Sequence, residues 1–190
     1  MTRIGIIGSG SIGSGLARLA VAAGDEVMIA NSRGPETLTE LVTELGPRAQ
    51  AGTVEQAAGF GDLTILAVPL SAYGSLPLEL LSGRTVLSTG NYYPSRDGQI
   101  TELDSLNLTT AEYETKLLPG AVIVKAFNNI VAHHIPSLSR PAEAQDRRRP
   151  VGTGRDAGPV RAARPARGRP RSPSECGVAV RGAALDAPTP

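Results

Sequence analysis

Apolar and polar residues follow two patterns over the first 130 residues: short continuous apolar runs, and longer stretches with helical spacing. The apolar runs are rich in Ile, Val, Leu and Ala, which is typical of strands buried on both faces of a sheet. The pattern predicts six strands, at residues 3–8, 26–31, 49–53, 63–70, 84–91 and 121–130.

Between these runs, apolar residues recur at the three- and four-residue spacing of helices that cover a sheet. Residues 11–24 place Ile12, Leu16 and Leu19 on one helical face, and Gly24 suits a C-terminal cap. Further helices are predicted at residues 34–46, 54–60 and 108–118. Strands that alternate with helices predict an α/β fold of the Rossmann type, doubly wound, with a mainly parallel sheet.

The composition changes after residue 145, which predicts a domain at 1–145 and a separate C-terminal tail at 146–190. The tail holds one Leu and no Ile, Phe, Tyr or Met, and it is dominated by Arg, Ala, Gly and Pro. Such a segment buries too little apolar area to offset the entropy of ordering, so we expect it to be disordered. The four dominant residue types also suggest a reading-frame shift in a GC-rich gene, a hypothesis that the coding DNA would test.

The net charge of +1 conceals two unequal parts. Residues 1–145 hold nine Lys and Arg against fourteen Asp and Glu, whereas residues 146–190 hold ten Arg against four acids. A basic tail is a feature of nucleic-acid-binding proteins, but this one lacks aromatic residues and any known reading module. Nucleic acid is therefore not an expected partner.

Cysteine and histidine content limits the possible sites and the compartment. The single Cys176 excludes an internal disulfide and fits a reducing cytoplasm. One cysteine and two histidines make a structural zinc site improbable. Since no apolar run approaches the roughly 20 residues of a membrane span, a cytoplasmic protein without a membrane partner is expected.

The strongest chemical signal is a G-x-G-x-x-G motif between the first predicted strand and an amphipathic helix. In this context the first glycine permits a tight turn, the second admits a diphosphate, and the third packs the helix on the strand. The helix N-terminus adds free N–H groups and a partial positive charge. The alternative is a glycine-rich turn without a ligand, which this context disfavours. The predicted cofactor-binding residues of this loop are Gly8, Ser9, Gly10, Ser11, Ile12 and Gly13.

The second predicted strand ends in Asn31, Ser32 and Arg33, where NAD-binding chains usually carry an acidic residue for the ribose 2′-hydroxyl. None of the three is negatively charged, so a 2′-phosphate would not be repelled. Arg33 can pair with that phosphate and stack on adenine, while Ser32 donates a hydroxyl. We therefore expect NADP(H) as the cofactor, the alternative being that Arg33 is an ordinary solvated side chain.

The ends of the fourth and fifth strands are expected to face the same crevice, because ligands bind at the carboxyl ends of parallel strands. Val68 and Pro69 would border the adenosine and the nicotinamide ribose. Asn91 would hold the nicotinamide ribose or amide, unless it serves only its own turn. Tyr92 and Tyr93 could flank a flat substrate, although packing is the commoner role for at least one of them.

Lys125 is unusual because it lies inside an apolar strand, and two interpretations stay open. It could neutralise a phosphate or an acidic group of the substrate, or it could form an ion pair with a carboxylate at the edge of the core. His133 and His134 are adjacent and would point in different directions on a helix, so they do not make a metal site. No nucleophile, carboxylate pair or metal cluster is visible, and no catalytic residue is predicted. Hydride transfer between two bound cofactors depends mainly on their alignment.

Together with "AVPLSAY" and with "VKAFNN" after "LLPGA", these motifs resemble the NADP-dependent oxidoreductases related to coenzyme F420 reductase. The resemblance covers about residues 3–145 and implies hydride transfer between NADPH and a deazaflavin. It also implies that Ser32 and Arg33 bind the 2′-phosphate, and that Val68 and Ala126 line the nicotinamide side. The pyrroline-5-carboxylate reductase superfamily opens with the same fingerprint but adds a helical dimerisation domain, for which this chain is too short.

The sequence thus predicts an NADP(H)-dependent oxidoreductase whose partner is a small-molecule hydride acceptor, coenzyme F420 or a similar flat molecule. The alternative is a non-catalytic NADP(H)-binding module or an inactive, truncated reductase, because a family member would continue after residue 145 with a further strand, helix and strand. A homodimer is compatible with the sequence.

Overall fold

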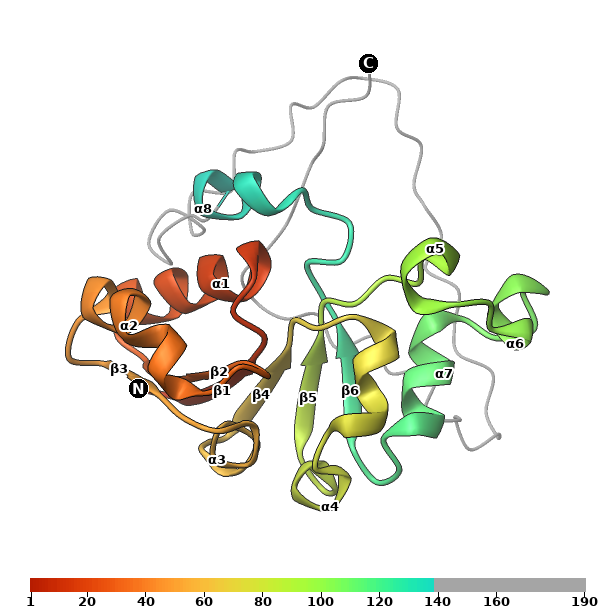
Figure 1. Ribbon diagram of the computed structural model, residues 1–190, viewed down its shortest axis with the longest axis horizontal. Helices are drawn as coiled ribbons and strands as arrows, with labels where there is room; N and C mark the ends of the chain where they lie inside the picture. The colour runs from red at the N-terminus through yellow and green to blue at the C-terminus, as the bar shows by residue number, and fades with distance from the viewer. Residues whose placement is uncertain (139–190) are drawn as a thin grey trace, which may run out of the picture. The chain divides into compact units, whose positions relative to one another are not determined.

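The six predicted strands form one parallel sheet in the computed structural model, which describes residues 1–138. The strands are β1 (Arg3–Ile7), β2 (Glu26–Ala30), β3 (Ala49–Ala51), β4 (Leu63–Leu66), β5 (Thr85–Ser88) and β6 (Val122–Lys125). Their order in the sheet is β3-β2-β1-β4-β5-β6, and every neighbouring pair is parallel (Figure 1). This order is that of a doubly wound Rossmann-type sheet, so the predicted fold class is confirmed.

Helices connect the strands. The α-helices are α1 (Ser11–Ala22), α2 (Thr39–Leu45), α3 (Val54–Gly59), α4 (Leu78–Leu81), α5 (Pro94–Asp97), α6 (Thr101–Asp104), α7 (Thr110–Leu117) and α8 (Ile135–Leu138). The 3₁₀ helices are η1 (Pro35–Leu38), η2 (Leu70–Ser75) and η3 (Ala132–His134). Of these, η2, α4, α5, α6 and α8 were not expected, because four to six residues are too few to show a helical period.

The largest differences from the predicted boundaries are at the ends of three strands. The fourth strand stops at Leu66 rather than at residue 70, the fifth at Ser88 rather than at residue 91, and the last at Lys125 rather than at residue 130. The chain leaves the extended conformation at Phe127, whose φ of 62° lies in the left-handed region. The predicted domain boundary at residue 145 and the predicted disorder of residues 146–190 concern a part of the chain outside the described residues.

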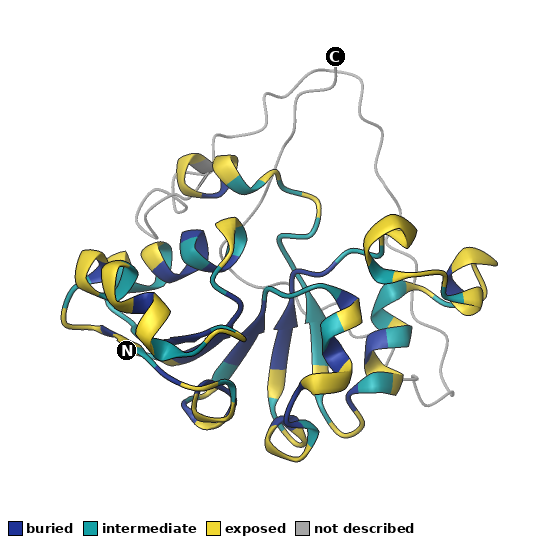
Figure 2. Ribbon diagram, in the orientation of Figure 1, coloured by how far each residue is buried: buried dark blue, intermediate teal, exposed yellow. Residues whose placement is uncertain are grey.

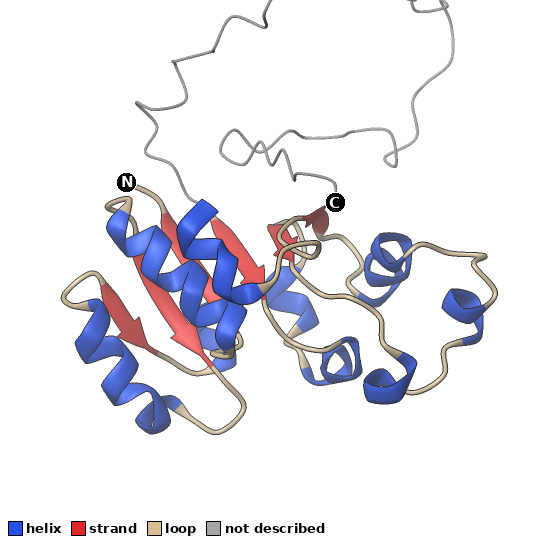
Figure 3. Ribbon diagram, turned by 90° about the horizontal axis from the view of Figure 1, so that it is seen from above, coloured by secondary structure: helices blue, strands red, loops and turns tan. Residues whose placement is uncertain are grey.

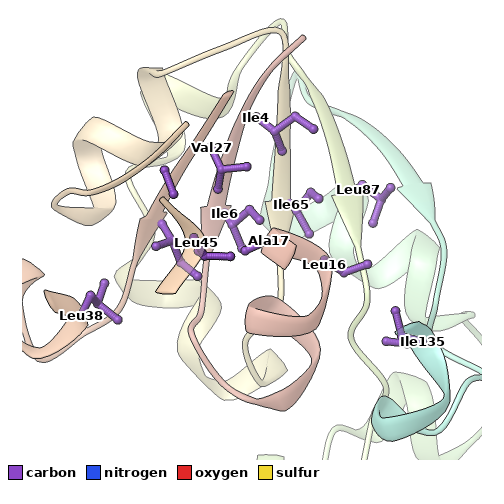
Figure 4. Close-up of a cluster of buried hydrophobic side chains, with 12 residues drawn as sticks. Ile4, Ile6, Leu16, Ala17, Val27, Leu38, Leu45, Ile65, Leu87 and Ile135 are labelled. Carbon is purple, nitrogen blue, oxygen red and sulfur yellow. The ribbon is translucent and has the colours of Figure 1, made fainter. Parts of the chain in front are cut away.

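Alternation along each strand divides the core into two layers, one on each face of the sheet. Ile6 lies between Ile29 and Ile65 of the neighbouring strands, and all three join the cluster packed under α1 and α2 (Figure 4). The next residues in register, among them Ile7 and Leu66, face α3, α4 and η2 on the other side.

The helices therefore cover both faces of the sheet, as the view from above shows (Figure 3). The exposed residues gather on the outer sides of the helices and in the turns (Figure 2). No helix among residues 1–138 is long and apolar enough to cross a membrane. Because all six strands are parallel, their carboxyl ends lie along one edge, and the loops at that edge form the candidate site.

Candidate dinucleotide site

The glycine motif connects β1 to α1, and two of its glycines are required by packing. Gly8 has a φ of 109°, and a Cβ at this position would overlap the carbonyl oxygen of Ala67 at the end of β4. A Cβ on Gly13 would overlap the carbonyl oxygen of Gly8 itself. The loop and the first turn of α1 therefore pack against the end of β4 in a way that only glycine permits.

Gly10 is different, because neither packing nor backbone conformation requires a glycine there. Its φ is −68°, and no atom of the described chain lies within 4 Å of the place that a Cβ would occupy. Gly10 is the N-cap residue of α1, and no side chain caps this helix. The free N–H groups and the positive end of the helix dipole therefore face open space. Such a helix start is suited to binding a diphosphate.

Asn31 joins the glycine loop to the loop after β2. Its amide nitrogen donates to Ser9 Oγ at 3.1 Å and to Thr37 Oγ1 at 3.0 Å, and its Oδ1 accepts from the backbone N–H of Arg33 at 2.9 Å. The sequence suggested that Asn31 binds cofactor directly. That role stays a prediction, and in the structure the side chain fixes one loop against the other.

Ser32 and Arg33 follow at the surface and are both exposed. Among residues 1–138, no carboxylate lies within ion-pair distance of the Arg33 guanidinium. This guanidinium stands at the carboxyl end of β2, next to the loop that Asn31 holds. It is available to an anionic ligand at the position where the cofactor's adenosine ribose lies in doubly wound folds.

A cleft of about 580 Å³ opens between the ends of β4, β5 and β6 and the start of α1. Four of the predicted site residues line it, namely Ile12, Val68, Pro69 and Asn91. Ala126 is not among the lining residues and packs instead against the hydrophobic cluster under α1.

Asn91 links the ends of β5 and β6 across this cleft. Its amide nitrogen donates to the backbone carbonyl of Asn128 at 2.6 Å, and its own carbonyl accepts from Arg96 Nη2 at 2.7 Å. The left-handed conformation of Phe127 turns the chain just before Asn128. Asn91 therefore holds the cleft in shape, while no hydrogen bond within the described part of the chain uses its Oδ1.

One wall of the cleft is formed by the N-cap residue of α5, Tyr93, and by Arg96 within that helix. The sequence predicted this wall only in part. Tyr93 was considered as a flank for a flat substrate, and Arg96 was not considered at all. The Arg96 guanidinium carbon lies 5.0 Å from the centroid of the Tyr93 ring. The spacing of an aromatic and an arginine three positions apart could have signalled this pair, had a helical turn been expected there.

Lys125 forms an ion pair, which decides between the two interpretations left open by the sequence. Its ammonium lies 2.9 Å from Glu114 Oε1 of α7 and also donates to Ser88 Oγ at 3.1 Å and to the carbonyl of Gly90. The Tyr73 hydroxyl donates to the same carboxylate oxygen at 3.1 Å. Burial and the nearby Glu114 charge raise the pKa of Tyr73. The network lies beneath the cleft, which it reaches through Gly90.

His133 and His134 belong to η3, and their ring centroids are 4.1 Å apart in an edge-to-face arrangement. Within residues 1–138, no group of His, Cys, Asp and Glu side chains could hold a metal ion.

Comparison with known proteins agrees with this geometry. The model of a family described as NADP oxidoreductase, coenzyme F420-dependent, matches residues 3–92. The solved structure of a hypothetical protein from Sinorhizobium meliloti is 31% identical, with a TM-score of 0.63 over 75% of this chain and 69% of that one. A proposed F420-dependent NADP reductase from Arthrobacter sp. FB24 has the same fold, with a TM-score of 0.60 over 77% of each chain and 19% identity.

A curated relative, the metalloreductase STEAP3 of Rattus norvegicus, is 30% identical over 145 residues. The match covers 75% of this chain but only 28% of the rat protein, so the chain spans about a quarter of that relative's length.

Proposed function

Because the chain belongs to the family of NADP oxidoreductases described as coenzyme F420-dependent, we propose that it passes hydride from NADPH to a deazaflavin or a similar flat acceptor. One observation supports the choice of cofactor: Arg33 is exposed, has no ion-pair partner among residues 1–138, and its backbone N–H bonds Asn31, which in turn bonds Ser9 just before the uncapped start of α1. Two phosphate-binding features are thereby held together, one suited to the diphosphate and one to the 2′-phosphate.

The residues present fit the cofactor. The space beside Gly10 and the free N–H groups of α1 would hold the diphosphate, and Ser32 with Arg33 would hold the 2′-phosphate. Val68, Pro69 and Asn91 line the cleft where the nicotinamide end would lie. NADPH, when bound, supplies a hydride with its two electrons, and the acceptor gains that hydride together with a proton from solvent.

The chain's own contribution is alignment. The described residues that line the cleft include no Asp, Glu, His, Cys or Lys, and the proposal assigns no proton transfer to a side chain there. Asn91 and Asn128 fix the cleft in one shape, and its apolar walls from Ile12, Val68 and Pro69 exclude water from the reacting rings. A small-molecule acceptor and a cytoplasmic location, where the single cysteine stays reduced, belong to the same proposal.

The test uses the purified full chain with NADPH or NADH and either oxidised coenzyme F420 or no acceptor. We expect reduction of F420 with equal consumption of NADPH, and a binding affinity for NADPH at least about tenfold above that for NADH, or ~1.4 kcal/mol. Equal or tighter binding of NADH would contradict the proposal. Binding of NADPH without any turnover would favour the alternative, a non-catalytic NADP(H)-binding module.

A further inference from the structure

The cleft carries one charged side chain among the described residues that line it, the guanidinium of Arg96. The other lining side chains are apolar, hydroxyl or amide groups. The two phosphate-binding features of the cofactor site are elsewhere, at the start of α1 and at Arg33. The nicotinamide ring, which the cleft would receive, carries no anionic group. The charge of Arg96 is therefore not explained by the cofactor.

Arg96 is held in place by the carboxylate of Asp97, which is not among the residues that line the cleft. Asp97 accepts from Arg96 Nε at 3.1 Å and Nη2 at 2.8 Å, and its side chain is fully buried. The same carboxylate accepts from the backbone N–H of Tyr93 at 3.0 Å and from the N–H and hydroxyl of Ser71, both at 3.4 Å. Asp97 is thus saturated by the protein, whereas 43% of the Arg96 side chain is exposed.

One edge of the guanidinium is left open. Nε and Nη2 donate to Asp97, and Nη2 also donates to the carbonyl of Asn91. No hydrogen bond within residues 1–138 uses Nη1. The two N–H groups of Nη1 can therefore donate to an oxyanion, and the ion pair behind them fixes their direction.

Tyr93 adds a flat apolar surface beside this open edge. Tyr93 is 51% exposed and lines the cleft. The guanidinium carbon of Arg96 lies 5.0 Å from the centroid of its ring. An exposed ring next to a guanidinium is suited to a planar ligand, which can stack on both.

We propose that Arg96 and Tyr93 form a recognition site for the hydride acceptor, and that they select flat heteroaromatic acceptors that carry a phosphate or carboxylate on a side chain of the ring. This proposal rests on the proposed function, because it specifies the chemical class of the hydride acceptor that the cleft would bind beside NADPH. Arg96 is then a specificity-determining residue that acts on the acceptor and leaves NADPH binding unchanged.

The experiment compares wild type and Arg96→Ala with matched 5-deazaflavins. One pair is 5-deazariboflavin with and without its 5′-phosphate, and a third compound carries a carboxymethyl group at N10 in place of the ribityl chain. Fluorescence titration gives the affinity of each compound, and NADPH oxidation gives kcat/KM. We expect Arg96→Ala to lower affinity and kcat/KM about tenfold or more for the anionic compounds, and less than about twofold for 5-deazariboflavin.

Each other outcome has a defined meaning. An equal loss for charged and uncharged acceptors would make Arg96 a structural residue only, and a weaker affinity for NADPH would assign it to the cofactor. Either result overturns the proposal, as does wild-type binding that does not distinguish the phosphorylated compound. Should wild type bind the anionic deazaflavins through Arg96 without oxidising NADPH, the recognition site stands and the proposed function fails.

Two further variants separate the charge from the fold. Arg96→Lys keeps the positive charge and should retain part of the preference for anionic acceptors. Arg3→Ala removes an exposed arginine at the opposite edge of the sheet, and it should leave the affinity for all three acceptors unchanged. Tyr93→Leu should weaken all three acceptors alike, because stacking does not depend on their charge.

Discussion

The ammonium of Lys125 lies 2.9 Å from the carboxylate of Glu114, and this pair joins β6 to α7 directly beneath the cleft. The Glu114 side chain is fully buried, and its Oε2 has no hydrogen-bond partner among the described residues, so Lys125 is its one countercharge there. Lys125 also donates to the carbonyl of Gly90, which lines the cleft. The ion pair therefore supports the floor of the cleft.

Removal of Lys125 alone should therefore be costly. Lys125→Met leaves the buried Glu114 carboxylate without a countercharge, and we expect the free energy of unfolding to fall by about 3 to 5 kcal/mol. The double variant Glu114→Gln with Lys125→Met removes both charges and should recover much of that loss. Urea denaturation of wild type, both single variants and the double variant measures these effects, and single costs that simply add in the double variant would show that the two groups do not interact.

Gly10→Ala tests the diphosphate site without disturbing the fold. No described atom lies within 4 Å of the added methyl group and the φ of −68° suits alanine, so stability should stay within about 1 kcal/mol of wild type. The methyl group would occupy the space assigned to the diphosphate, and the affinity for NADPH should fall about tenfold or more, or ~1.4 kcal/mol.

Calorimetric titration with NADPH and thermal melting give these two quantities separately. Gly59→Ala is the matched control, because its added methyl also meets open space, at the end of α3. Unchanged NADPH affinity in Gly10→Ala would show that the diphosphate does not bind at this loop. Gly13→Ala, by contrast, should unfold readily, since its methyl would overlap the Gly8 carbonyl oxygen.

The positions of the strands and of the motif glycines were predictable because both signals are local. A buried parallel strand is a continuous apolar run, as in "RIGII", and the overlap that makes Gly13 necessary arises five residues away at Gly8. The sheet order then follows from the general rules for doubly wound folds.

The contacts that shape the cleft depend on tertiary structure, and the sequence could not specify them. Asn91 meets the carbonyl of Asn128 from 37 positions away, because β5 and β6 are neighbours in the sheet. Lys125 of β6 reaches Glu114 of α7 only because α7 packs against β6. Arg96 required a single helical turn, α5, which is too short to leave a periodic signal.

Arg33→Ala should reduce the preference for NADPH over NADH. A charge-assisted hydrogen bond to a phosphate contributes about 1.5 to 3 kcal/mol, so the affinity for NADPH should fall roughly tenfold to hundredfold. NADH lacks the 2′-phosphate, and its affinity should change less than about twofold. Arg48→Ala, which removes an exposed arginine near the amino ends of the strands, serves as the control. Equal losses for the two cofactors would show that Arg33 does not select the phosphate.

The Asp97 carboxylate gives the α5 wall of the cleft a stability that depends on pH. Burial raises the pKa of this group, but hydrogen bonds from Arg96 and from the backbone of Tyr93 and Ser71 outweigh burial and lower it from 3.8 to about 2. A carboxyl whose pKa is lower in the folded state stabilises the fold above its ordinary pKa. That contribution disappears as the pH falls from about 4 to about 2.

Asp97→Asn should therefore lower the free energy of unfolding by about 2 kcal/mol at pH 7, and the difference from wild type should shrink to about 0.5 kcal/mol at pH 2. Asp62→Asn makes the same chemical change at an exposed position and should stay within about 0.5 kcal/mol of wild type throughout. Urea denaturation at several pH values measures both curves. A difference between Asp97→Asn and wild type that stays constant from pH 7 to pH 2 would mean that the Asp97 charge does not hold the wall, and the fixed direction of Arg96 would then need another cause.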